Sequence, residues 1–192
     1  MFQMMQWGLI PFWVKTWNDA ESIRKKTINA RAETLFEKPS FRYAAENHRC
    51  LIPVDGFFEW RYYQKKNYPY YIYLKTHEIF SFAGIYETWS NPESNKMFQT
   101  FSIVTTDANP LMAKIHNKKK RMPVILMKDE EMKWLDDSLN SDDLKKLLIP
   151  INEDLIDAHT VSKRLTSRTQ KRNVPAVLDR FEYPELPDLL LG

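Results

Sequence analysis

Two side chains, Glu59 and His116, are of types that transfer protons in enzymes and stand out from their neighbours. Glu59 lies between Phe58 and Trp60, and poor solvation among aromatic rings raises the pKa of a carboxyl group. Such a carboxyl group can serve as a general acid or base near neutral pH. Because alternate residues of a strand face opposite ways, Glu59 fits the solvent face of a two-faced strand equally well.

His116 follows an expected short helix, 111–115, and histidine is the natural proton shuttle near pH 7. A helix C-terminus favours the protonated imidazole, whereas the adjacent cations, Lys118-Lys119-Lys120-Arg121, oppose it. The alternative is a histidine whose ring is hydrogen-bonded to a backbone carbonyl.

Asn29 and Arg31 precede a possible helix that opens at Ala32, in the loop that enters it. The Asn29 amide could orient a reacting group, and the Arg31 guanidinium could hold a phosphate. Asn29 is equally suited to cap the helix or to form a turn.

Aromatic and basic side chains form local groups that suit a nucleic-acid partner. Phe12, Trp13 and Trp17 lie in a Pro-flanked segment, where they could stack on bases or belong to the core. Net charge is only +3, yet residues 118–121 and 163–172 are basic runs. Such runs could contact phosphates or form solvated surface loops.

Composition bounds the remaining possibilities. The 192 residues suit one domain, and they contain no 18-residue apolar run that would predict a membrane span. The start lacks a secretory pattern, and the single Cys50 fits a reducing cytosol. We interpret Cys50 as a structural residue, since buried free cysteines behave as small hydrophobes. We expect no metal and no cofactor, because the four histidines are widely spaced.

Strands dominate the middle of the chain. The stretch 49–60 reads as a strand, an Asp55-Gly56 turn and a partner strand. Strand patterns at 68–74, 79–86 and 98–105 follow one another closely, as antiparallel neighbours do. The sequence therefore predicts an α+β fold with a mostly antiparallel, curled sheet and short peripheral helices.

Five motifs carry a resemblance to a known family. They are, in chain order, Trp7-Gly8-Leu9-Ile10-Pro11, Asn29-Ala30-Arg31-Ala32-Glu33-Thr34, Arg49-Cys50-Leu51-Ile52-Pro53-Val54-Asp55-Gly56-Phe57-Phe58-Glu59-Trp60, Ala83-Gly84-Ile85-Tyr86-Glu87, and Ile115-His116 followed by Arg121-Met122-Pro123-Val124-Ile125-Leu126. Together they resemble the SOS-response-associated peptidase-like (SRAP) family, over residues 7–175.

The resemblance implies a single domain over 1–192 with a β-barrel-like core. It also implies a sensor of abasic sites in single-stranded DNA, working as a cytoplasmic monomer that joins the nucleoid during DNA damage. In this family an amino-terminal cysteine, exposed by self-removal of the initiator Met, closes a thiazolidine with the abasic aldehyde. The result is a DNA–protein cross-link.

Site residues follow from the matching motifs. The resemblance implies that Asn29 positions the cysteine, that Glu59 does acid–base work on the imine and on Met removal, and that His116 moves a proton at the sugar oxygen. It implies DNA contacts at Phe12, Trp13, Arg31, Thr105, Arg121, Lys163 and Arg164.

The chain departs from the family pattern in two places. The family begins with Met-Cys-Gly-Arg, well ahead of the Trp-Gly motif that here starts at Trp7, so we expect the amino-terminal strand and its cysteine to be absent. Lys118, Lys119 and Lys120 look like an insertion that could displace Arg121.

Three functions remain open at this point. The first is abasic-site cross-linking. The second is a non-catalytic module that binds single-stranded nucleic acid. The third is a peptidase acting on other proteins, which is disfavoured because the sequence shows no thiol, serine triad or metal set for it.

Overall fold

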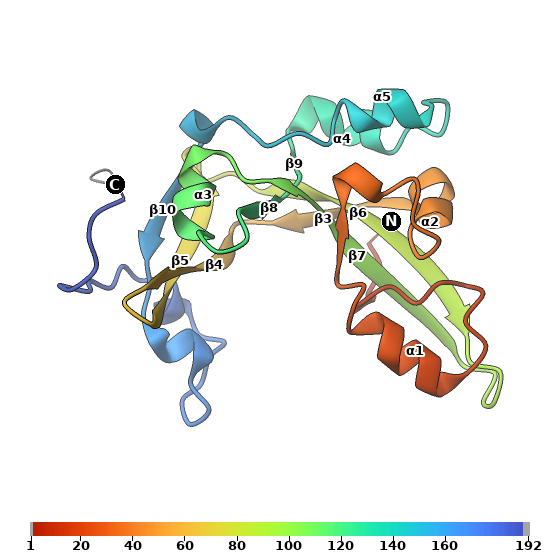
Figure 1. Cartoon of the computed structure of the whole chain (residues 1–192), viewed down its shortest axis with the longest axis horizontal. Helices are drawn as coiled ribbons and strands as arrows, with labels where there is room; N and C mark the ends of the chain where they lie inside the picture. Colours follow the sequence, from red (N-terminus) through yellow and green to blue (C-terminus); the bar gives the residue numbers. More distant parts are fainter. Residues whose placement is uncertain (1, 190–192) are drawn as a thin grey trace. The chain divides into compact units, whose positions relative to one another are not determined.

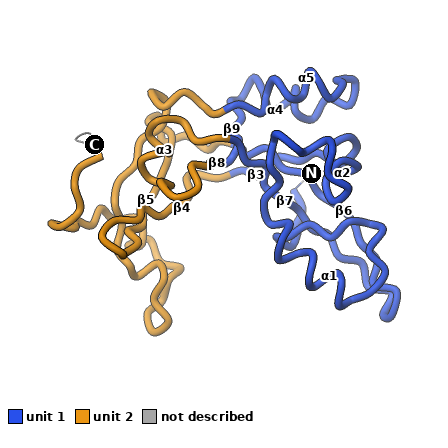
Figure 2. The backbone as a smooth tube through the Cα atoms, in the orientation of Figure 1, with its two compact units in different colours: residues 1–53, 81–106, 123–149 blue, residues 54–80, 107–122, 150–192 orange. Residues whose placement is uncertain are grey.

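The computed structural model describes residues 2–189, and the chain divides into two compact units (Figure 2). Unit 1 comprises Met1–Pro53, Ser81–Thr106 and Pro123–Ile149. Unit 2 comprises Val54–Phe80, Asp107–Met122 and Pro150–Gly192. The single domain expected over 1–192 stays a prediction about how the two units behave together.

A mixed sheet organises unit 1 (Figure 1). Among the described residues, the strands of this sheet that lie in unit 1 are β1 (Gln6–Trp7), β2 (Asn29–Arg31), β3 (Arg49–Val54), β6 (Phe80–Ser90), β7 (Met97–Asp107) and β9 (Ile125–Leu126), apart from single end residues of β3, β6 and β7. A seventh strand, β8 (Arg121–Pro123), has its first two residues in unit 2. The long strands β6 and β7 are antiparallel, whereas β1 and β2 pair with β7 in parallel. Gly84 of β6 permits a close approach, since a Cβ there would lie 2.8 Å from the Cys50 sulfur.

Short helices accompany this sheet: α1 (Trp17–Arg24), the 3₁₀ helix η1 (Ala32–Thr34), α2 (Arg42–Asn47), α4 (Lys128–Trp134) and α5 (Ser141–Lys145). Helix α1 was not expected, although Thr16 caps it by accepting a hydrogen bond from the Asp19 N–H. The core includes Leu35, Ile85 and Trp134, all fully buried.

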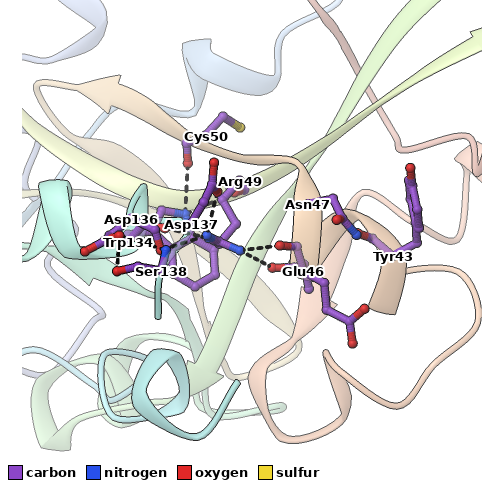
Figure 3. A network of polar contacts seen from close by, with 11 residues as sticks. Tyr43, Glu46, Asn47, Arg49, Cys50, Trp134, Asp136, Asp137 and Ser138 are labelled. Atoms are coloured by element: carbon purple, nitrogen blue, oxygen red, sulfur yellow. Dashed lines mark hydrogen bonds and ion pairs between the residues drawn. The ribbon is translucent and has the colours of Figure 1, made fainter. Parts of the chain in front are cut away.

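One buried side chain, that of Arg49, joins the ends of two helices in unit 1 (Figure 3). Its guanidinium donates to the carbonyls of Ala45 and Glu46 at the end of α2. On its other side it donates to the carbonyl of Trp134, the last residue of α4, to that of Asp136, and to a carboxylate oxygen of Asp137. Arg49 thus donates to three carbonyls in the last turns of α2 and α4, where helices leave carbonyls without intrahelical partners, and to the Asp136 carbonyl beyond α4.

Unit 2 is built on a three-stranded antiparallel sheet of order β10-β5-β4. Its elements are β4 (Phe57–Tyr63), β5 (Lys66–Leu74), α3 (Pro110–Ile115), η2 (Glu153–Leu155), β10 (Ile156–Thr160), η3 (Lys163–Thr166) and η4 (Pro175–Val177). Strand β4 lies at one edge of this sheet, and the register places Glu59 opposite Tyr70.

The α+β class is confirmed, with mixed and antiparallel sheets and short helices, but the curled, barrel-like core is not found among residues 2–189. The reason lies at the Asp55-Gly56 turn, which does not close the expected hairpin. β3 pairs with β6 and β4 pairs with β5, so the turn joins two open sheets. Gly56 is needed there for space, because a Cβ would lie 2.4 Å from the Tyr71 ring.

Candidate active site

Glu59 and His116, far apart in sequence, lie side by side in unit 2. Glu59 projects from β4, and His116 is the C-cap residue of α3. A Glu59 carboxylate oxygen lies 3.6 Å from Nδ1 of His116, and the two side chains are 23% and 22% exposed. The pair is therefore partly shielded from water and still open to a ligand.

Hydrogen bonds define which ring nitrogen of His116 carries its proton. Nδ1 lies 2.9 Å from the carbonyl oxygen of Arg121, and a carbonyl can only accept, so Nδ1 holds a hydrogen. In the neutral ring, Nε2 then keeps its lone pair. The other oxygen of Glu59 accepts the Trp60 N–H at 2.9 Å, which orients the carboxylate.

This arrangement can do acid–base chemistry. Nε2 of His116 can take a proton, and the Glu59 carboxylate lies beside the same ring. Nε2 can return that proton in a later step, which is the behaviour required of a proton shuttle.

A second carboxylate–imidazole pair, His48 and Glu87, lies in unit 1, with 3.2 Å between Nδ1 and the carboxylate. Burial raises the pKa of Glu87, opposed by a hydrogen bond from the Thr88 N–H and by His48. The Glu87 side chain is only 4% exposed. A ligand could not reach its carboxylate, so this pair is the poorer candidate for catalysis.

The basic segment after His116 folds into a compact turn. The Lys120 N–H donates to the His116 carbonyl at 2.8 Å, and Lys120 adopts φ 50°. The Lys118 ammonium lies 3.4 Å from the centroid of the Tyr62 ring. Arg121 then donates to Asp107 at 2.7 Å while its carbonyl faces the imidazole. The added lysines thus leave Arg121 beside His116.

Asn29, Arg31 and Thr105 lie on adjacent strands of unit 1. The sequence predicted that Asn29 and Arg31 lie in a loop. They belong instead to the short strand β2. Both are exposed on one face of β2, and Ala30 between them is buried. Arg31 pairs in register with Thr105, whose hydroxyl lies 3.4 Å from the Ala30 carbonyl.

Phe12 and Trp13 are exposed at 53% and 46%, so neither is a core residue. Phe12 contacts the ring of Tyr43, with 4.8 Å between centroids, and the indole N–H of Trp13 donates to Pro39. Tyr43 is also exposed, so its ring adds to the exposed rings of Phe12 and Trp13. The sequence did not predict this residue.

Lys163 and Arg164 make contacts within unit 2. The Lys163 ammonium lies over the rings of Tyr68 and Tyr183, at 4.7 and 5.4 Å from their centroids. Arg164 donates from Nε to the carbonyl of Lys171. Both cations therefore order the segment that carries the second basic run.

Cys50 has the properties of a structural residue. Burial raises the pKa of its thiol to about 12, so it is protonated at neutral pH. Among residues 2–189, no three side chains of His, Cys, Asp or Glu come together as a metal site would require. No described helix combines the length and apolar character needed to span a bilayer.

Comparison with known proteins gives the family. The model of the SOS response associated peptidase (SRAP) family matches residues 1–168. The chain belongs to the SRAP family.

Individual SRAP relatives agree. The chain is 45% identical over 177 residues to the abasic site processing protein YoqW of Bacillus subtilis, spanning 91% of this chain and 75% of YoqW. It is 32% identical over 178 residues to the abasic site processing protein HMCES of Xenopus tropicalis, spanning 82% and 51% of the two chains. A crystal structure of a protein from Bacteroides thetaiotaomicron matches with a TM-score of 0.90 and 45% identity, over 94% of this chain and 77% of that one.

Sequence reasoning missed two residues beside the pair, Asp107 and Asn117. Asp107 binds the Arg121 guanidinium, and Asn117 binds the backbone of β4. Asn117 directly follows His116, so adjacency to a candidate catalytic residue was the available signal.

Proposed function

We propose that this protein processes abasic sites in single-stranded DNA through acid–base chemistry at Glu59 and His116. The observation that carries the proposal is the partly exposed carboxylate–imidazole pair with its fixed Nδ1 proton. Membership of the SRAP family and similarity to YoqW support the same substrate.

The proposed reaction is the covalent capture of an aldehyde. An abasic sugar opens to an aldehyde, an amine adds to its carbon, and loss of one water gives an imine. A neighbouring thiol then adds to the imine carbon and its proton passes to nitrogen, which closes a thiazolidine. The proposed nucleophile is an amino-terminal cysteine, exposed by self-removal of the initiator Met. The sequence holds no cysteine besides Cys50, an internal, half-buried residue whose thiol has a pKa raised to about 12 and is unsuited to this role.

The roles of the polar residues follow the family resemblance. Nε2 of His116 moves the proton of the sugar oxygen during ring opening, and Glu59 stabilises the imidazolium and serves the imine steps. Asn29 orients the nucleophile, and Arg31, on the same exposed face of β2, holds a phosphate.

DNA binding combines stacking with phosphate contacts. Phe12 and Trp13 offer exposed rings to bases, which single strands leave unpaired. We propose further contacts at Thr105, Arg121, Lys163 and Arg164. A DNA substrate would place the protein in the cytoplasm, at the nucleoid during DNA damage.

The proposal is tested with abasic and intact single-stranded oligonucleotides of one sequence. The 192-residue chain is compared with the same chain placed behind a segment that starts with Met-Cys, here called the Met-Cys form. A heat-stable adduct is expected only from the Met-Cys form and only on abasic DNA. No adduct in that reaction would refute the proposed chemistry.

A second candidate function is non-catalytic binding of single-stranded DNA, favoured by the exposed rings of Phe12 and Trp13. It predicts retention of intact strands that weakens steeply with salt and leaves no adduct. Failure of the 192-residue chain to retain DNA at low salt would exclude it.

Asp107 is expected to compete with DNA for Arg121. The Asp107 carboxylate lies 2.7 Å from the guanidinium and is 81% exposed, so a phosphate could displace it. The Arg121 side chain is 14% exposed. Because Asp107→Asn removes the charge that competes with a phosphate for it, the substitution should tighten binding of single-stranded DNA by about 3-fold at low salt.

Asp129→Asn is the matched control for this prediction, because it removes the same charge from an exposed pair with Lys133. Fluorescence anisotropy of a labelled strand measures both affinities. Equal gains from the two variants would show that net charge alone is responsible and that Arg121 is not involved.

A further inference from the structure

The edge of strand β4 is occupied by side chains in place of a further strand. β4 ends the β10-β5-β4 order, so the backbone groups on its far side need other partners. The Trp60 N–H donates to Glu59 at 2.9 Å. The Tyr62 N–H donates to Oδ1 of Asn117 at 3.1 Å, and Nδ2 of Asn117 donates back to the Tyr62 carbonyl at 2.8 Å.

These bonds attach both members of the acid–base pair to one stretch of edge. Trp60 and Tyr62 are alternate residues of a strand, about 7 Å apart. The backbone N–H of Trp60 fixes the Glu59 carboxylate. The backbone N–H of Tyr62 fixes Asn117, which directly follows His116 in the chain. The 3.6 Å separation of Glu59 and His116 thus depends on where Asn117 binds β4.

We infer that Asn117 is the positioning residue of the Glu59–His116 pair. Its amide carries an acceptor oxygen and a donor nitrogen side by side, so it pairs with both the N–H and the C=O of Tyr62. The catalytic meaning of this inference rests on the proposed function, whereas its geometric content does not.

The remainder of the segment reinforces the anchor. The Lys118 ammonium lies over the ring of Tyr62, the same residue whose backbone binds Asn117. The Lys120 N–H closes the turn onto the His116 carbonyl, and Arg121 then presents its own carbonyl to Nδ1. Loss of the Asn117 bonds would free this turn from β4 and loosen the contact between Nδ1 and its acceptor.

The first experiment reads the proton of His116 directly. Long-range ¹H–¹⁵N correlation spectra of ¹⁵N-labelled protein distinguish a neutral ring with hydrogen on Nδ1 from one with hydrogen on Nε2. We expect the Nδ1–H form in the unaltered chain. Asn117→Ala should shift the ring towards the Nε2–H form, which free histidine prefers. An unchanged spectrum of the His116 ring overturns the inference.

Two further variants keep the result interpretable. Asn117→Asp retains an acceptor for the Tyr62 N–H and loses the donor, so it should give a smaller shift, and it replaces Asn117→Ala if that variant does not fold. Asn47→Ala is the matched control, because it also removes a side-chain bond to a backbone carbonyl, that of Tyr43, and should leave His116 unchanged.

The second experiment measures the reaction. In the Met-Cys form with saturating abasic strand, Asn117→Ala should lower the rate of adduct formation by roughly 10- to 100-fold, with the Kd for DNA unchanged. An undiminished rate overturns the catalytic part of the inference if Glu59→Gln does lower it. If Glu59→Gln has no effect either, the proposed function fails, and the spectra still decide whether Asn117 positions His116.

Discussion

Glu59→Gln in the Met-Cys form is expected to lower the rate of adduct formation on abasic single-stranded DNA by about 100-fold or more. Glutamine keeps the size of the side chain and can still accept the Trp60 N–H through its amide oxygen. It carries no negative charge, so the imidazolium of His116 loses the partner that lies 3.6 Å from Nδ1. The rate is measured in a single turnover at saturating DNA, so that binding does not contribute.

Glu78→Gln provides the control, since it makes the same chemical change at an exposed site in unit 2. Its rate should equal that of the unaltered Met-Cys form. A Glu59→Gln variant that reacts as fast as this control would show that the Glu59 charge plays no part in the reaction. A loss that disappears at saturating DNA would contradict the proposed role as well, because Glu59 would then act in binding.

Arg49→Met is expected to destabilise unit 1 by about 3 kcal/mol, because the lost guanidinium is the buried donor to several backbone carbonyls and each buried acceptor left unsatisfied costs about 1–3 kcal/mol. The Arg49 side chain is 2% exposed and bonds to four backbone carbonyls and to Asp137. Methionine fills similar space but cannot donate, so the carbonyls of Ala45, Glu46 and Trp134 lose this donor, whereas that of Asp136 keeps the Leu139 N–H. Urea denaturation, followed by circular dichroism, measures the loss.

Arg24→Met is the matched control for Arg49. Its guanidinium forms a partly exposed i,i+3 pair with Glu21 on α1, and pairs near the surface contribute about 1 kcal/mol or less. Equal losses in the free energy of unfolding would show that the Arg49 hydrogen bonds stabilise the protein no more than the Arg24–Glu21 ion pair does. Arg49→Lys should also destabilise, since one ammonium cannot reach acceptors on both sides.

The sequence predicted the strands more successfully than their pairing. Period-two patterns and β-prone residues located β5, β6 and β7, because these signals are local. The predicted Asp55-Gly56 hairpin was wrong because strand pairing depends on residues distant in sequence. β3 pairs with β6, and β4 pairs with β5. Strand β2 was missed for the same reason: three residues become a strand only by pairing with β7.

The candidate site shows the same limit. The residue types of Glu59 and His116 suggested acid–base chemistry, and the family resemblance connected them, but no local pattern predicts that two such distant residues meet. Arg49 opens the 49–60 motif, but the sequence predicted no role for it. Its acceptors lie at the ends of two helices, which no local pattern brings together. Asn117 likewise gains its significance only from the edge of β4.

The central claim is that Glu59 and His116 act as one acid–base unit in abasic-site chemistry. The most direct test is the single-turnover rate of the double variant Glu59→Gln/His116→Gln in the Met-Cys form, compared with the two single variants. Groups that act as a unit are strongly non-additive, so the account predicts a rate close to that of the slower single variant. A double variant whose loss equals the product of the two single losses would contradict it.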